Sequence, residues 1–110
     1  MIELDYLPIT KSRNNADNFI IELDETNYIF EIYWNDLNKY FAFNLYDIDE
    51  EPIILGRKIT YGVDMLDNII DDKIPAVEIL PVNPAVEDDH ITFDNFINSV
   101  KCYILPAGGE

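Results

Sequence analysis

The sequence is poor in residue types that many functions require, with one cysteine, one histidine and seven lysines and arginines among its 110 residues. Because a single cysteine, Cys102, cannot form an internal disulfide, nothing indicates an oxidising compartment. The seven basic side chains stand against 22 acidic ones, and the resulting formal charge of -15 repels a phosphate backbone or an anionic membrane. We therefore expect neither direct nucleic-acid binding nor membrane association.

A long uncharged run and a secretory signal are also missing. The uncharged stretches fall far short of the roughly 20 residues that cross a bilayer, and residues 1–7 carry two acids where a signal peptide carries lysine or arginine. A hydrophobic content of 48% is enough to build a core, and the length suits one domain. We expect a single β-domain over residues 1–110, with its core at about 18–105 and a frayed tail at 106–110, made in the cytoplasm.

Alternating apolar side chains predict an antiparallel meander of three strands at residues 18–23, 28–34 and 40–46. Polar breaks of hairpin length separate the three runs, which are rich in β-branched and aromatic residues. One face of this sheet is apolar throughout, whereas the opposite face is only partly polar and carries several tyrosines. That second face is covered either by another layer of the same chain or by another chain.

The second half of the chain indicates shorter strands. Gly56 and Gly62 interrupt the next apolar region and predict a bulge or a tight turn there. Pro81 confines a strand at residues 76–82 to the edge of a sheet or ends it early, and residues 100–105 supply the closing strand.

Between the last two strands, Thr92 predicts the N-cap of a short helix that runs through Asn98. The Phe93, Phe96 and Ile97 side chains would lie on one side of that helix. Together these elements predict a mostly β fold, a compact antiparallel β-sandwich or small barrel of six or seven short strands with one or two short helical turns.

Two acidic segments resemble metal sites, but each lacks essential ligands. Residues 86–90 place three carboxylates beside His90, yet no second histidine or second cysteine exists to complete a transition-metal site. Residues 47–51 resemble the opening of a calcium loop, but its sixth position is Pro52 instead of glycine and its twelfth is Lys58 instead of glutamate. We therefore expect no metal, and interpret both segments as solvated acidic turns.

Catalytic patterns are equally incomplete. Residues 56–62 place two basic residues between two glycines and so resemble a phosphate-binding loop, but the segment lacks the Gly-Lys-Ser/Thr ending and no helical pattern follows it. Ser12 and Ser99 have no glycine context of a nucleophile elbow, and the alternating pattern around Cys102 indicates a small core residue. We expect no catalytic residue and no cofactor, and therefore no enzyme.

The aromatic residues are more informative, because they exceed what one small core absorbs, and tyrosine and tryptophan are enriched at protein interfaces. A fold that buries both sheet faces by itself explains them equally well. If they do form a partner interface, we expect it to comprise seven residues, namely Tyr33, Trp34, Tyr40, Tyr46, Arg57, Lys58 and Tyr61.

The order of the segments resembles a known family. The start IELDYLPI at residues 2–9 is followed by the aromatic meander, which carries Tyr-Trp-Asn at its second turn. The segment GRKITYGVDML then follows at residues 56–66, and an acidic turn precedes the closing strand VKCYIL at residues 100–105. This order is similar to that of the small baseplate plug proteins of contractile-tailed bacteriophages, over nearly the whole chain. The most specific stretch is GRKITYGVDML.

The resemblance implies a structural role in the virion. It implies a β-domain seated in the central hub of the tail baseplate, near the tail tube and spike, in several symmetric copies with threefold symmetry favoured. The implied partners are hub and tail-tube proteins and the end of the tape-measure protein, and assembly would take place in the bacterial cytoplasm. The acidic composition suits this role, because an acidic protein beside a conduit repels the DNA that slides past it.

Two other functions compete with this one. An acidic inhibitor that mimics DNA would bind the basic cleft of a nucleic-acid enzyme, but it needs carboxylates in a row at about 7 Å along a strand. Here the acids cluster in turns, at residues 47–51, 64–72 and 87–89. A small ligand-binding barrel would need small, polar interior residues, and the phenylalanines of the meander would fill such an interior instead of lining a cavity.

Overall fold

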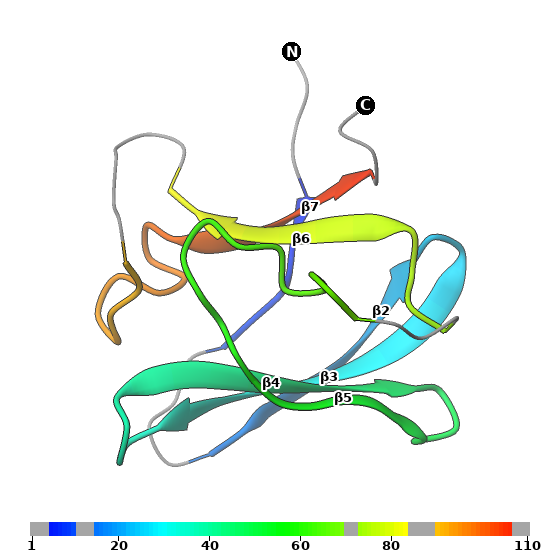
Figure 1. Cartoon of the computed structure of the whole chain (residues 1–110), viewed down its shortest axis with the longest axis horizontal. Helices are drawn as coiled ribbons and strands as arrows, with labels where there is room; N and C mark the ends of the chain where they lie inside the picture. Colours follow the sequence, from blue (N-terminus) through cyan, green and yellow to red (C-terminus); the bar gives the residue numbers. More distant parts are fainter. Residues whose placement is uncertain (1–4, 11–14, 70–72, 84–89, 107–110) are drawn as a thin grey trace.

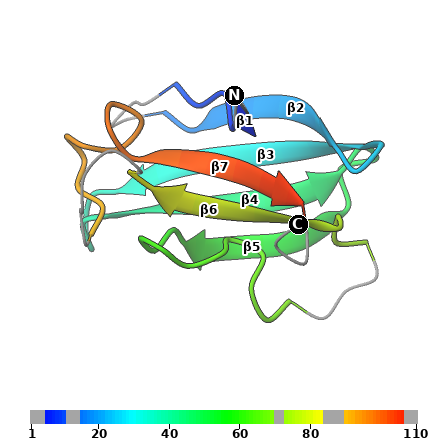
Figure 2. The same ribbon diagram turned by 90° about the horizontal axis from the view of Figure 1, so that it is seen from above.

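The computed structural model describes residues 5–10, 15–69, 73–83 and 90–106 and contains two antiparallel sheets packed face to face (Figure 1). One sheet has the strand order β2-β3-β4-β5 and the other has the order β1-β7-β6, as Figure 2 shows from above. No hydrogen-bonded ladder joins the two sheets, so the fold is a sandwich and not a closed barrel. The strands are β1 (Asp5–Tyr6), β2 (Asp17–Leu23), β3 (Thr26–Asn35), β4 (Tyr40–Asp47), β5 (Pro52–Lys58), β6 (Val77–Val82) and β7 (Lys101–Pro106).

The predicted three-stranded meander is confirmed as β2, β3 and β4. Leu23 pairs with Thr26 across a two-residue turn, in which Asp24 and Glu25 both have positive φ, 52° and 68°. This is the backbone of a type I′ hairpin, whose twist matches that of the flanking strands. The second hairpin has a longer loop, which Lys39 closes by donating its backbone N–H to the Asn35 carbonyl at 2.7 Å.

The strand β5, the last in the larger sheet, carries the bulge that Gly56 predicts. Phe43 pairs with Arg57 and Leu45 pairs with Ile54, so one residue of β4 lies opposite two residues of β5, Leu55 and Gly56. The extra residue bends the strand, and Gly56 adopts a φ of 66°, which glycine reaches without steric cost. The bulge therefore interrupts the pairing of β5 with β4, which resumes at Arg57 and Lys58 before the chain leaves the sheet.

The segment that follows β5 crosses to the other sheet and covers the edge of β6. The N–H groups of Gly62 and Met65 donate to the carbonyls of Pro81 and Ile79 at 2.9 and 2.8 Å. The Asp64 carboxylate accepts the Ile79 N–H at 2.9 Å, so a side chain takes the place of a neighbouring strand. The crossing segment thereby satisfies the outward backbone groups of Ile79 and Pro81 in β6, which lies at an edge, as Pro81 predicts.

The core lies between the two sheets and is filled by side chains that alternate along the strands. Phe30 and Phe43 are fully buried on the inner face of the four-stranded sheet, and their rings lie 6.1 Å apart. Ile79 and Cys102 face them from the other sheet and are also buried. The remaining core side chains come from both sheets and from the connections, and they include Leu7, Leu23, Tyr28, Ile32, Phe41, Leu45, Ile54, Ile59, Met65, Leu66 and Phe96.

The expected helix at residues 92–98 is replaced by consecutive turns, and the described residues contain no helix. Thr92 does cap the first turn, because its hydroxyl accepts the Asn95 N–H at 3.0 Å. Ile97 then adopts a φ of 60°, which ends helical geometry after a single turn. The turns carry Phe93 and Phe96 onto Phe41 at ring separations of 5.7 and 4.3 Å, so burial of these rings decides the conformation.

The first strand was not anticipated. β1 pairs with β7, and Leu7, which follows it, is buried in the core although it precedes the expected core range of 18–105. The tail expected to fray begins at Pro106, but Pro106 is the last residue of β7 and pairs with Val77 of β6. Residues 107–110 lie outside the described residues.

Replacing Phe43 with alanine should destabilise the fold by about 3 to 5 kcal/mol, because the change removes a fully buried ring between the sheets. Chemical denaturation of the two proteins measures the difference. A loss below about 1 kcal/mol would show that the inner face of β4 does not form the core.

Candidate functional site: the outer face of the four-stranded sheet

The outer face of the four-stranded sheet collects three of the tyrosines expected at an interface. Along β3 and β4, alternation turns Tyr33, Tyr40 and Tyr46 away from the core, and all three are half-buried by their neighbours on the sheet. The hydroxyl of Tyr33 reaches across β4 to Gly56 on β5. A Cβ placed on Gly56 would lie 3.7 Å from the Tyr33 hydroxyl oxygen. We call this surface the tyrosine face.

A hydrogen-bonded network fixes the middle of the tyrosine face. The Glu31 carboxylate accepts the Asn44 side-chain amide at 2.7 Å and the Tyr46 hydroxyl at 3.2 Å. Asn44 in turn accepts the Gly56 N–H at 2.7 Å, so the network joins β3, β4 and β5. Partial burial and the Glu31 carboxylate raise the pKa of Tyr46, which keeps its hydroxyl protonated as a donor.

Aliphatic side chains extend the tyrosine face on both sides. Ile20 pairs with Ile29, which pairs with Tyr46 on the next strand, so the three side chains form a continuous apolar row. Ile20 is 62% exposed, and Leu55 on β5 is 64% exposed. Strand alternation in the sequence could have identified this row, but the candidate residues were chosen for being aromatic or basic.

A small pocket lies where the tyrosine face meets the connections. It has a volume of about 130 Å³ and contains two of the seven basic side chains, Lys39 and Lys58. The Lys58 ammonium lies 5.2 Å from the centre of the Tyr40 ring, within the range of a cation–π contact. Tyr61 and His90 also line the pocket, so three of the expected interface residues meet here.

Two of the expected interface residues lie elsewhere. Trp34 is on the inner side of β3, where its ring packs 4.8 Å from Phe41 and 5.1 Å from Phe93, and it closes one end of the sandwich. Arg57 pairs with Phe43, which points inward, so it does not share the face of Lys58. Tyr61 lies in the crossing segment, where its hydroxyl accepts the Asn83 N–H at 3.1 Å.

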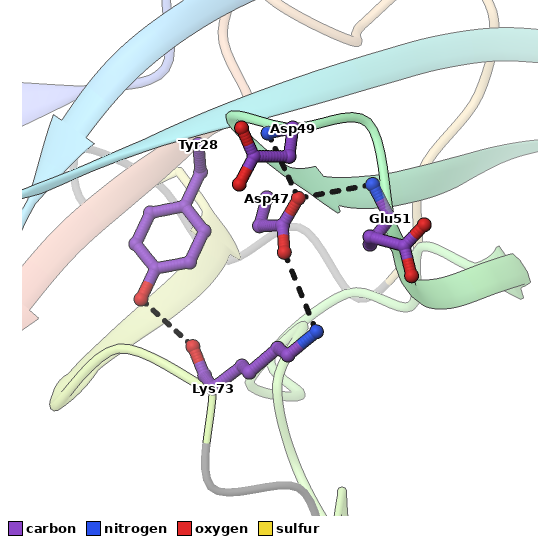
Figure 3. A network of polar contacts seen from close by, with 5 residues as sticks. All are labelled: Tyr28, Asp47, Asp49, Glu51 and Lys73. Carbon is purple, nitrogen blue, oxygen red and sulfur yellow. Dashed lines mark hydrogen bonds and ion pairs between the residues drawn. The ribbon is translucent and has the colours of Figure 1, made fainter.

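The segment compared with a calcium loop uses its first carboxylate for its own turn (Figure 3). Asp47 accepts the N–H groups of Asp49 and Glu51, both at 2.9 Å, and forms an ion pair with Lys73 at 3.3 Å. The Tyr28 hydroxyl donates to the Lys73 carbonyl at 2.8 Å, which ties the turn to the connection before β6. The Glu51 N–H, with smaller contributions from Lys73 and Asp49, lowers the pKa of Asp47.

The remaining candidate groups add no chemistry. Cys102 is buried as expected, and burial raises the pKa of its thiol to about 12, so it is neutral at physiological pH and a poor nucleophile. In the described part of the chain, no three histidine, cysteine or acidic side chains cluster as a metal site would require. Residues 86–89 of the acidic segment before His90 lie outside the described residues, and no described helix is able to span a membrane.

A comparison with protein families identifies what kind of protein has this arrangement. The family model described as cyanophage baseplate Pam3 plug gp18 matches residues 4–107, a range that includes all seven strands. The chain belongs to this baseplate plug family. The resemblance inferred from the segment order is therefore confirmed, and the protein is a structural component of a phage tail baseplate. No curated protein matches the chain.

Family membership gives a reason for the features of the baseplate plug described above. The segment GRKITYGVDML contains the β5 bulge and the whole of the crossing segment that covers β6. Its pattern is therefore explained by the closure of the sandwich. Residues 58–61 of this stretch also line the pocket beside the tyrosine face.

Changing Asp47 to asparagine should make the unfolding free energy of the plug less dependent on pH in the acidic range. The lowered pKa means that the ionised carboxylate stabilises the folded state above the ordinary pKa of 3.8 and that this stabilisation is lost as the pH falls through the lower folded value. The difference in unfolding free energy between the wild-type protein and Asp47→Asn should therefore shrink as the pH falls from 6 to below 3.

Denaturant unfolding at several pH values measures this difference. Lys73→Gln is the matched control, because it removes the ion pair but leaves both turn amides on Asp47, and most of the pH dependence should remain. A difference that is constant from pH 6 to pH 2 would show that the Asp47 carboxylate does not hold the turn.

Proposed function

We propose that this plug occupies the central hub of the baseplate, near the tail tube and spike, and that it docks there through the tyrosine face. The composition of that face supports this proposal, because three half-buried tyrosines lie beside the exposed aliphatic side chains of Ile20 and Leu55. Aromatic and aliphatic side chains on a flat sheet face are typical of the centre of a protein interface.

The hydrogen-bonded network supports a docking role for the tyrosine face. Glu31 on β3 holds Asn44 and Tyr46 on β4, and Asn44 also accepts the Gly56 N–H of β5. Because they are held in this way, these side chains lose little conformational freedom when a partner covers them. The Glu31 carboxylate is satisfied by two donors on the face itself, which reduces the cost of removing it from water.

The charge of the plug limits the kind of partner. A formal charge of -15 makes copies of the chain repel one another at low salt, so a stable assembly needs apolar contacts or a partner that brings positive charge. A hub protein is the proposed partner, with tail-tube proteins and the end of the tape-measure protein beside it. In this arrangement several copies, with threefold symmetry favoured, would be arranged around the conduit, and their acids would repel the passing DNA.

The inhibitor that mimics DNA is the weaker alternative. One carboxylate oxygen of Asp47 accepts hydrogen bonds from turn amides and the other pairs with Lys73. The Asp64 carboxylate accepts hydrogen bonds from the N–H groups of Leu66 and Ile79. Carboxylates that hold turns are not presented in a row to a basic cleft, and the family match favours a structural role. We likewise infer that the plug has no enzymatic activity, and that it reaches the virion after assembly in the host cytoplasm.

The purified plug should be monomeric or weakly self-associating at low ionic strength and should form a defined ring, with threefold symmetry favoured, when the hub protein of the same phage is added. Leu55→Asp should fold normally, because Leu55 is 64% exposed, but a buried charge at the interface should weaken ring formation at least about tenfold. Light scattering measures both results.

Leu37→Asp is the matched control, since Leu37 is 89% exposed in the loop between β3 and β4, away from the tyrosine face. This variant should form the ring as the wild-type protein does. A stable, salt-insensitive dimer that ignores the hub protein would contradict the proposed function and would place the inhibitor ahead of it. Equal loss in both variants would contradict docking through the tyrosine face.

A further inference from the structure

The two sheets end in four edge strands, and three of them are protected against the addition of another strand. The crossing segment covers β6, and β1 is only two residues long. β5 begins with Pro52, carries the bulge at Gly56 and ends with Lys58, three features that discourage edge pairing. In the described part of the chain, β2 has none of these devices: its seven residues, DNFIIEL, pair with β3 in an unbroken register.

The hairpin geometry decides which backbone groups of β2 point outward. Leu23 and Thr26 flank a two-residue turn and exchange hydrogen bonds, so every second residue back along β2 also bonds to β3. The N–H and C=O groups of Asn18, Ile20 and Glu22 consequently point away from the sheet. These groups are the hydrogen-bonding positions that an added strand would use.

An apolar groove adjoins the second half of this edge. It has a volume of about 370 Å³ and lies between β2 and the other sheet, where Ile21 and Leu23 face Val77 and Ile104. Three carboxylates line it as well, those of Asp5, Glu22 and Asp24, and among the described residues no lysine or arginine does so. The remaining lining residues are Tyr6 and Pro8.

We propose that the edge of β2 is a strand-addition site that takes an extended segment of a partner protein in which apolar and basic residues alternate. The backbone of the segment would pair with Ile20 and Glu22, and its apolar side chains would fill the groove between the sheets. Its lysines or arginines would face the other way, near the Glu22 carboxylate on the outer side of β2, and the carboxylates of Asp5 and Asp24 at the groove add to the attraction for a basic segment.

A second copy of the chain is a poorer occupant of this edge. Antiparallel pairing of two β2 strands would bring the Glu22 and Asp24 carboxylates of both copies to one seam, in two chains that each carry a charge of -15. The edge borders the tyrosine face at Ile20, whose side chain lies on that face, but an added strand would use the backbone of β2 and the groove between the sheets. Strand addition and docking to the hub protein are therefore tested separately, by the amide signals of β2 and by ring formation.

The test uses the isolated full-length protein and the peptide acetyl-Lys-Val-Lys-Ile-Lys-Val-Lys-amide as the probe. We expect the backbone amide signals of Ile20 and Glu22 to shift in NMR titrations, with binding that weakens at least about threefold as salt rises from 50 to 300 mM. A peptide of the same composition with its four lysines grouped first should bind more weakly, because it cannot present apolar and basic residues to opposite sides.

Two substitutions separate strand addition from general attraction between opposite charges. Ile20→Pro removes the outward N–H and fills the edge with a ring, so it should abolish the shifts, whereas Ile20→Thr keeps the N–H and the β-branched shape and should bind as the wild-type protein does. Glu22→Lys, at an exposed position, should weaken binding of the lysine peptide and strengthen binding of a peptide that has glutamate in place of lysine. This variant supplies the test if Ile20→Pro fails to fold.

Equal binding by Ile20→Pro and the wild-type protein, equal binding of the two peptides, or shifts confined to Tyr33 and Tyr46 would overturn the proposal. Sedimentation provides the remaining outcome. Concentration-dependent dimers that are lost in Ile20→Pro would show that a second copy occupies the edge and would overturn the choice of a basic partner segment.

Discussion

The burial of one face of each sheet against the other is the interaction on which the rest of the molecule depends. Phe30 and Phe43 on the larger sheet meet Ile79 and Cys102 on the smaller one, and all four are fully buried. Packing of this kind holds the sheets together without joining their backbones, so the edge strands keep outward N–H and C=O groups that need partners. Among the described residues, the crossing segment provides such partners for β6, whereas none are provided along β2.

Alternation along the strands made most of the fold predictable. The meander, the bulge at Gly56 and the edge position of the strand with Pro81 followed from residue patterns, because each depends on local backbone chemistry. The short β1 and the turns at residues 92–98 did not follow, since they depend on burial against distant residues: Leu7 joins the core, and Phe96 packs on Phe41. A helical pattern of three apolar residues was too short to outweigh that packing.

The candidate surface was predictable only in part, for a related reason. Alternation places Tyr33 and Trp34 on opposite faces of β3, yet choosing residues by type grouped them together. The pairing register then decides which side chains become neighbours, and it brings Glu31 opposite Asn44 and Ile29 opposite Tyr46. Register and the course of the connections, which place Tyr61 beside Tyr40, are tertiary features that a single sequence does not specify.

In the described part of the chain, one side of the sandwich is closed by the crossing segment, while the other side presents the open edge of β2. Amide hydrogen exchange of the isolated protein distinguishes the two sides. We expect slow exchange at Met65, whose N–H donates to the Ile79 carbonyl, and at Ile79, whose N–H donates to the Asp64 carboxylate. Along β2 we expect fast exchange at Ile20 and Glu22, whose N–H groups point outward, and slow exchange at Ile21 between them, which pairs with β3. Equal protection of Ile79 and Ile20 would contradict this account.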